Sequence, residues 1–204
     1  MTKIKICGIR RTKDAEFLNS YPPDYTGFIL SQQFKRSISY EQLENISKAL
    51  TGKIKRVGVF VNESYEYIMR YAPLLDVVQL HGNENNDLIL RLKKSTSCEI
   101  WKAVRVKSED DIVAACALSA DKLVLDSFSD NSYGGTGKTA DWSLIKNTDI
   151  SKPFFIAGGI NEENCISVIN TLNPYGIDLS SSVETNGYKD ESKIKKIILK
   201  LRIN

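Results

Sequence analysis

Residues 154–159, Phe154-Phe155-Ile156-Ala157-Gly158-Gly159, combine four successive apolar side chains with a pair of glycines. A short run that is apolar throughout is typical of a strand buried on both faces, as in a parallel sheet. The same kind of run recurs along the whole chain at intervals of 22 to 32 residues. The other seven runs begin near Lys3, Tyr25, Lys55, Val77, Glu99, Lys122 and Gly176. The sequence therefore predicts eight strands.

Between these runs lie segments with the periodicity and the start signals of helices. Ser39, followed three residues later by Gln42, has the pattern of a capping box. Ser108 precedes three acidic residues, which suit the positive end of a helix. We predict that Asn62 and Asn161 cap two further helices. The alternation of strands with helices indicates parallel strands joined by crossover helices.

Two architectures of the α/β class fit this alternation, a closed (β/α)8 TIM barrel and an open doubly wound sheet. Eight units of nearly equal length favour the barrel, although the 204 residues of the chain lie near the lower size limit of that fold. We expect a single barrel domain over residues 1–204. In such barrels the active site is built from the residues that directly follow the strands.

The composition is that of an ordinary globular protein. The chain is 42% apolar, with 28 basic and 25 acidic side chains and a formal net charge of +3. So small an excess gives no argument for nucleic-acid binding, and no apolar stretch approaches the ~18 residues of a membrane span. The N-terminus lacks the apolar segment of a signal peptide, so we expect a cytoplasmic protein. Four widely spaced cysteines and one histidine argue against a compact zinc site, and we predict no metal centre.

Two reactive side chains end predicted strands. Cys7 closes the first run and precedes Gly8, and a thiol there is a candidate base or nucleophile if positive charge lowers its pKa. A small buried side chain is the commoner role for an isolated cysteine. Asp126 closes the run that begins at Lys122, where burial raises the pKa of a carboxyl toward values that suit a general acid. A capping role in the next loop is equally compatible with Asp126 alone.

Two turns that follow the last two strands are candidates for a phosphate site. They are Gly158-Gly159 and Ser180-Ser181-Ser182. Barrels frequently bind phosphate after strands seven and eight, through backbone N–H groups and a helix N-terminus. Ordinary tight turns would use the same residue types, but their occurrence on neighbouring strands favours the phosphate interpretation.

A glycine-rich segment, Ser132 to Thr139, has some likeness to a nucleotide-binding P-loop. The Walker A motif requires a glycine where Ser132 stands, and the segment begins about six residues beyond its strand instead of directly after it. We therefore expect a loop that closes over a substrate. A nucleotide-binding module is the alternative function from a different class.

Arg36 follows the second predicted strand and His81 follows the fourth. A guanidinium binds a carboxylate through two parallel hydrogen bonds, although an arginine by itself is most often a solvated surface charge. His81 has no metal-ligating companions in the sequence, so we expect a structural role or a place in the lining of the substrate site.

Taken in order, the residues after the strands form a recognisable series of motifs. The stretches are Lys5–Ile9, Gly27-Phe28, Ser31–Ser37, Val57–Phe60, Gln79–Gly82, Leu125-Asp126, Gly134–Gly137, Asp141-Trp142, Ala157–Ile160 and Asp178–Ser181. In this combination, which covers essentially the whole chain, the sequence resembles the phosphoribosylanthranilate isomerase family of tryptophan biosynthesis.

The resemblance implies a (β/α)8 barrel that carries out an Amadori rearrangement without a metal or cofactor. The substrate would be N-(5-phosphoribosyl)anthranilate and the product 1-(2-carboxyphenylamino)-1-deoxyribulose 5-phosphate. Asp126 matches the family's general acid, Cys7 its general base and Arg36 its ligand for the anthranilate carboxylate. The implied substrate-binding residues are Arg36, His81, Gly158, Gly159, Asp178, Ser180 and Ser181. A thiol that acts as a base is predicted to have a pKa below the ~8.5 of a free cysteine.

The sequence departs from the family pattern in three places. Ser182 stands where the family usually has a glycine, Ala140 where an aromatic residue usually precedes Asp141, and the loop before Arg36 lacks the usual proline. We expect Ser182 to alter the approach of the backbone to phosphate. Other phosphosugar barrels would share the phosphate site, so Cys7, Arg36 and Asp126 together distinguish this family from them. We expect a small-molecule substrate as the only class of partner, with no nucleic acid or membrane, and either a monomer or a homodimer.

Overall fold

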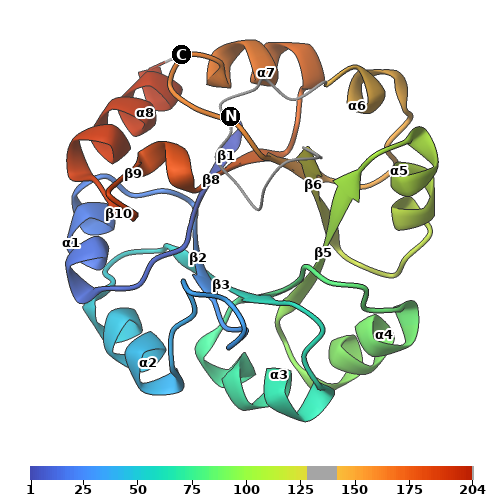
Figure 1. The fold of residues 1–204 in the computed structure, drawn as a ribbon, viewed down its shortest axis with the longest axis horizontal. Coiled ribbons are helices and arrows are strands. Elements are labelled where there is room, and N and C mark those ends of the chain that lie inside the picture. The colour runs from blue at the N-terminus through green and yellow to red at the C-terminus, as the bar shows by residue number, and fades with distance from the viewer. Residues whose placement is uncertain (128–141, 204) are drawn as a thin grey trace.

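The computed structural model describes residues 1–127 and 142–203, in which eight parallel strands form a closed barrel (Figure 1). The strands are β1 (Lys3–Cys7), β2 (Tyr25–Ile29), β3 (Lys55–Phe60), β4 (Val77–Leu80), β5 (Glu99–Val106), β6 (Lys122–Ser127), β7 (Phe154–Ala157) and β8 (Gly176–Leu179). Each strand pairs with the next in the sequence, and β8 closes the ring on β1. The predicted (β/α)8 barrel is confirmed, and every strand begins where its apolar run was predicted to begin.

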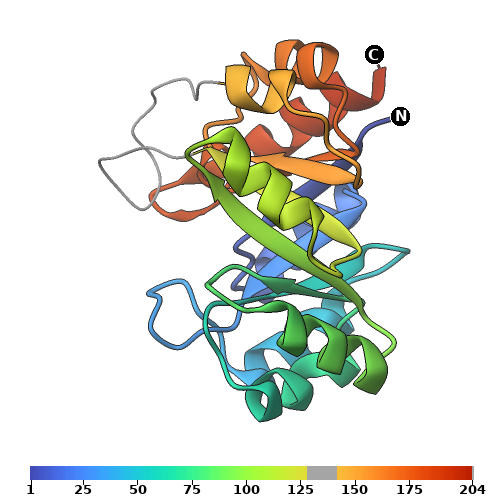
Figure 2. The ribbon, with the colours of Figure 1, turned by 90° about the vertical axis from the view of Figure 1, so that its right-hand side faces the viewer.

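Helices surround the barrel (Figure 1). They are α1 (Thr12–Ser20), α2 (Tyr40–Ala49), α3 (Tyr65–Tyr71), α4 (Asn86–Ser95), α5 (Glu109–Cys116), α6 (Ser143–Asn147), α7 (Cys165–Leu172) and α8 (Glu191–Ile203), with 3₁₀ turns η1 (Ala72–Leu74) and η2 (Ser181–Val183). A small antiparallel hairpin, β9 (Glu184–Thr185) and β10 (Tyr188–Lys189), lies between η2 and α8. The hairpin and the loop after β2 project from the same end of the barrel, on the left in Figure 2.

Side chains of each strand point alternately outward and inward, and this alternation creates two apolar layers. The outward residues, such as Ile4 and Ile6, pack against the helices in one large cluster. The inward residues form a second cluster from the strands alone, containing Tyr25, Val57, Val77, Trp101, Ala103, Val124, Phe155 and Ala157. The rings of Trp101 and Phe155 stack with their centroids 4.7 Å apart. These inward side chains fill the barrel interior, so it is a core and not a channel.

Above this apolar core the inward positions become polar. Lys5 and Gln79 are almost completely buried, and Asp178 pairs with Lys5 across the β1–β8 register. Burying such groups is unfavourable unless they find partners, so the change in side-chain character marks the end of the barrel that carries function.

Helix start signals were predicted with mixed success. Ser39 and Gln42 form the expected capping box of α2, and Ser108 caps α5. The prediction for α3 was wrong, because its cap is Ser64, whose hydroxyl accepts from Tyr67. Asn62 instead adopts a left-handed backbone, φ 54°, and its side chain accepts from the amide of the loop after β4. Similarly α7 is preceded by Asn164, and Asn161 forms the turn before it.

Candidate active site

The reactive side chains predicted from the sequence meet at the carboxyl end of the barrel. Cys7 is the last residue of β1, Asp126 lies one residue before the end of β6, and His81 directly follows β4. Asp178 of β8 interacts electrostatically with both Asp126 and His81, and Cys7 with Asp178. Because β8 adjoins β1 and is separated from β6 only by β7, its carboxylate acts on both the candidate acid and the candidate base.

Asp126 is part of a short line of polar groups. His81 Nε2 lies 3.7 Å from Asp126 Oδ2, and both side chains remain about one quarter exposed. On its other side, the His81 ring nitrogen Nδ1 is 3.0 Å from the amide nitrogen of Gln79. His81 therefore lies between the Gln79 side-chain amide and the Asp126 carboxylate.

Cys7 occupies a crowded and electrically charged position. Its thiol lies against Gly27 of β2, the residue that pairs with it in the sheet. The Lys5 ammonium, two residues earlier on the same face of β1, interacts with the thiol both electrostatically and by hydrogen bonding. Burial raises the pKa of Cys7, and the nearby Lys5 charge opposes this only in part. The prediction of a lowered thiol pKa was wrong for the free enzyme, because desolvation of the thiolate is the larger effect.

Gly27 is required to leave room for the Cys7 thiol. A Cβ atom at this position would lie 2.7 Å from Sγ and 3.1 Å from Cα of Cys7. We therefore expect Gly27→Ala to displace the thiol and to lower kcat about 10²-fold, the scale of a misplacement of roughly 1 Å. Steady-state kinetics on the folded variant measure this.

The matched control for Gly27→Ala is Gly58→Ala on β3. There an added Cβ would meet Leu75 and Phe60 in the outer apolar layer instead of the thiol. Gly58→Ala should lower the melting temperature and leave kcat close to wild type. A folded Gly27→Ala protein with unchanged kcat would show that the thiol position is not set by β2.

Arg36 reaches from the loop after β2 to the residues that follow β8. Its Nη1 donates to Ser180 Oγ at 2.9 Å and to Glu184 Oε1 at 3.3 Å. Ser180 Oγ in turn donates to the backbone carbonyl of Cys7. The guanidinium carries five N–H donors in a planar fork, and its side chain remains 39% exposed. It is therefore held beside the thiol with surface directed to solvent, and is not a free surface charge.

The two glycine- and serine-containing turns follow the paired strands β7 and β8. Gly158 and Gly159 both have positive φ, 84° and 66°, a backbone that glycine adopts without the strain of a Cβ. Ser180 caps η2, which begins at Ser181. The structure places these residues at neighbouring strand ends, as predicted. The hydroxyl of Ser182 is buried without a hydrogen-bond partner in the described part of the chain.

Comparisons with known proteins agree on one family. Residues 4–200 match the family model of N-(5'phosphoribosyl)anthranilate (PRA) isomerase. The chain belongs to this family. A relative with that activity in its name, from Thermoanaerobacter sp. strain X514, is 43% identical over 204 residues, which is 99% of this chain and 98% of the relative. This family membership makes the chain an isomerase of tryptophan biosynthesis.

Solved structures of the isomerase family share the fold over the full chain. The Thermotoga maritima enzyme is 36% identical with a TM-score of 0.88, and all of both chains is covered. A second isomerase structure contains reduced 1-(o-carboxyphenylamino)-1-deoxyribulose 5-phosphate. It is 34% identical with a TM-score of 0.83, again over all of both chains. Monomers generated from the dimeric Thermotoga maritima enzyme form a further similar structure, 36% identical over all of both chains with a TM-score of 0.84.

Several residues of this candidate site were not found from the sequence. Lys5 and Gln79 are buried inside the barrel, and Glu184 and Lys189 come from the β9–β10 hairpin. Lys5 lies two positions before Cys7, so the alternation of β1 places it on the same inward face, and that signal was available. Glu184 and Lys189 lie in a polar stretch whose pattern gave no indication of burial.

Three predictions fall outside the described residues. The loop expected to close over the substrate, its alternative as a P-loop, and Ala140 all lie within 128–141.

In residues 1–127 and 142–203, no helix has both the length and the apolar character needed to cross a membrane. No group of three His, Cys, Asp or Glu side chains in those ranges is arranged to hold a metal ion.

Proposed function

We propose that this chain isomerises N-(5'-phosphoribosyl)anthranilate with Asp126 as the general acid and Cys7 as the general base. The observation that carries the proposal is the convergence of this carboxyl and this thiol at the carboxyl end of the barrel, at the ends of β6 and β1. The Asp126 side chain keeps accessible surface and Cys7 is a partly exposed residue, as access to a substrate requires.

The reaction needs one proton delivered and one removed at different atoms. Protonation of the ribose ring oxygen by Asp126 breaks the C1–O bond and gives an open-chain Schiff base. Cys7 then removes the proton from C2, and the electron pair shifts to give the enol amine, which becomes the ketone product. An acid and a base on different strands suit these two steps because the reacting atoms lie on different sides of the sugar.

Asp178 and His81 supply contacts for the sugar in this scheme. Asp178 Oδ2 is held by Lys5 at 2.5 Å, while its Oδ1 is buried and has no partner among the described residues. A buried acceptor left without a donor is unfavourable, and a ribose hydroxyl would satisfy it. His81 lies next to Asp126 and would line the same part of the site.

The phosphate is assigned to the turns that follow β7 and β8. Gly158 and Gly159 let the backbone approach an anion closely, Ser180 caps η2 beside them, and Ser181 adds a hydroxyl donor. This position is a frequent phosphate site in barrels of this class. The buried hydroxyl of Ser182 would be a further donor where the family usually has a glycine.

Arg36 is assigned to the carboxylate of the anthranilate ring. Removal of a hydrogen bond to a charged group costs about 1.5–3 kcal/mol, so we expect Arg36→Met to raise KM roughly 10- to 100-fold with a smaller change in kcat. Steady-state kinetics separate the two constants. Arg91→Met, an exposed position on α4, is the control and should leave both unchanged. An unaltered KM in folded Arg36→Met would contradict the assignment.

The assay that tests the activity generates the substrate in situ and follows the loss of its fluorescence. Wild-type protein should consume it rapidly, and the Cys7→Ala variant should not. If the folded wild type leaves the fluorescence unchanged, the isomerase activity is refuted, and the other phosphosugar isomerisations become the substrates to test.

We also propose that the enzyme works in the cytoplasm, where its phosphorylated substrate is made and retained, as a monomer or homodimer. Light scattering after gel filtration distinguishes the two states. A larger assembly, or export of the protein, would contradict these assignments.

A further inference from the structure

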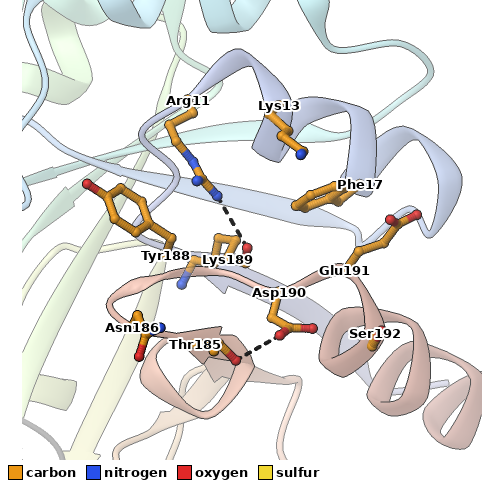
Figure 3. A pocket seen from close by; sticks show the side chains of 10 residues that line it. All are labelled: Arg11, Lys13, Phe17, Thr185, Asn186, Tyr188, Lys189, Asp190, Glu191 and Ser192. Carbon is orange, nitrogen blue, oxygen red and sulfur yellow. Dashed lines mark hydrogen bonds between the residues drawn. The ribbon is translucent and has the colours of Figure 1, made fainter.

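The β9–β10 hairpin brings a buried lysine to the edge of the active site. The Lys189 side chain is completely buried, and its Nζ donates to Glu184 Oε1 at 2.6 Å and to the Ser180 carbonyl at 3.0 Å. Figure 3 shows Lys189 in the hairpin wall opposite α1, where Arg11 donates to its backbone carbonyl at 3.3 Å. The lysine is therefore held at both its backbone and its ammonium group.

Burying an ammonium group is energetically unfavourable, because the charge loses its hydration, and a functional role would account for this cost. Lys189 shares its counter-ion, Glu184, with Arg36, because the same Glu184 oxygen also accepts from Arg36 at 3.3 Å. Both cations act electrostatically on Cys7, and Ser180, which contacts both of them, also contacts the Cys7 backbone. The unused lysine and the candidate base therefore belong to one cluster.

The charges around the thiol do not balance while the thiol is neutral. Three cations face it, Lys5 from β1, Arg36 from the loop after β2 and Lys189 from β10. Two carboxylates accompany them, Asp178 of β8 and Glu184 of β9. With all five groups charged the cluster carries one positive charge, three minus two. Ionisation of Cys7 to the thiolate brings the total to zero.

We propose that Lys189 is a positioning residue for the general base, and that its buried ammonium is a second counter-charge for the Cys7 thiolate beside that of Lys5. Both lysines are buried and each is paired with a carboxylate, Lys5 with Asp178 at 2.5 Å and Lys189 with Glu184 at 2.6 Å. Arg36 is the partly exposed cation of the three, so Lys5 and Lys189 are the two that burial shields from solvent. This inference rests on the proposed role of Cys7, and its test reads the thiol separately from the activity.

Burial disfavours the charged forms of both Lys189 and Cys7, so each charged form is stabilised by the other. Burial lowers the pKa of Lys189, and the nearby Cys7 acts in the opposite direction. Burial raises the pKa of Cys7, and Lys189 is among the cations that act against this rise. Removal of either charge should therefore destabilise the charged form of the other.

The charge count predicts that two substitutions in the hairpin shift the pH midpoint of Cys7 alkylation in opposite directions. Lys189→Met removes a positive charge and should move the pH midpoint of Cys7 alkylation by iodoacetamide up by about 1–2 units, the usual effect of a nearby opposite charge. Glu184→Gln removes a negative charge and should move it down. Mass spectrometry of the Cys7 peptide separates its reaction from that of the other cysteines, and Lys189→Arg should restore the wild-type midpoint.

The exposed Lys196→Met variant of α8 is the control for loss of a lysine, and thermal unfolding checks that each protein is folded. A folded Lys189→Met protein whose alkylation midpoint stays within 0.3 units of wild type, roughly 0.4 kcal/mol, overturns the inference. Equal shifts in the same direction for Lys189→Met and Glu184→Gln also overturn it, because they indicate a general structural change.

The pH profile of kcat distinguishes this inference from the base assignment on which it rests. If the acidic limb of kcat moves together with the alkylation midpoint, both are supported. If the midpoint moves and the kcat limb does not, Lys189 still sets the ionisation of Cys7, but Cys7 is not the base.

Discussion

Asp126→Asn should remove nearly all turnover while leaving the site able to bind its product. The amide keeps the shape of the side chain and its place beside His81, whose Nε2 lies 3.7 Å from Asp126 Oδ2. It has no acidic proton to give to the ribose ring oxygen. A single general acid typically contributes about 10²–10⁴-fold to a rate, and kcat should fall by at least the lower figure.

The measurement for Asp126→Asn is kcat together with the affinity for a reduced product analogue. We expect the affinity to change by less than about threefold, since no binding group of the correct shape is lost. Asp110→Asn, in the exposed first turn of α5, removes a surface carboxylate that is not among the candidate site residues and should leave kcat unchanged. Turnover retained within about tenfold in Asp126→Asn would exclude this residue as the acid.

The barrel was predictable because each of its strands is locally distinctive. The run after Lys122 and the run after Phe154 have few polar interruptions, so their burial and their starting points could be recognised without knowledge of their partners. The cap of α3 was harder to identify. Asn62 and Ser64 are both of residue types that cap helices well. Ser64 caps α3 because the Asn62 side chain is used in a contact with the loop after β4, which is distant in sequence.

The candidate site was predictable at strand ends and not beyond them. Cys7, Asp126 and His81 could be found because barrels place their chemistry after the strands. The contact of Arg36 with Ser180 joins residues 144 positions apart, and no local pattern indicates it. Lys189 has the sequence context of a surface lysine, and its burial is created by Glu184, Ser180 and the folded hairpin. The same limit applies to the Cys7 pKa, because the sequence showed the neighbouring charge but not the extent of desolvation.

Cys7→Ala is the second substitution with a large expected effect, a loss of about 10²–10⁴-fold in kcat. Alanine leaves the backbone of β1 and its pairing with Gly27 intact, so the loss should come from the missing base and not from unfolding. Cys116→Ala on α5 removes a partly exposed thiol and should leave kcat unchanged.

The pH dependence of the wild-type enzyme gives the sharper test of the same assignment. Burial raises the pKa of the Cys7 thiol in the free enzyme, and only the thiolate accepts a proton. The fraction of active enzyme therefore grows as pH rises toward this pKa, so kcat/KM should still be increasing with pH above ~8.5, where a free thiol is half ionised. An acidic limb that is complete well below that pH would mean that a group of lower pKa is the base. In that case Asp178 of β8 would be the carboxylate to substitute next, because it lies on the strand beside Cys7 and acts electrostatically on both Cys7 and Asp126.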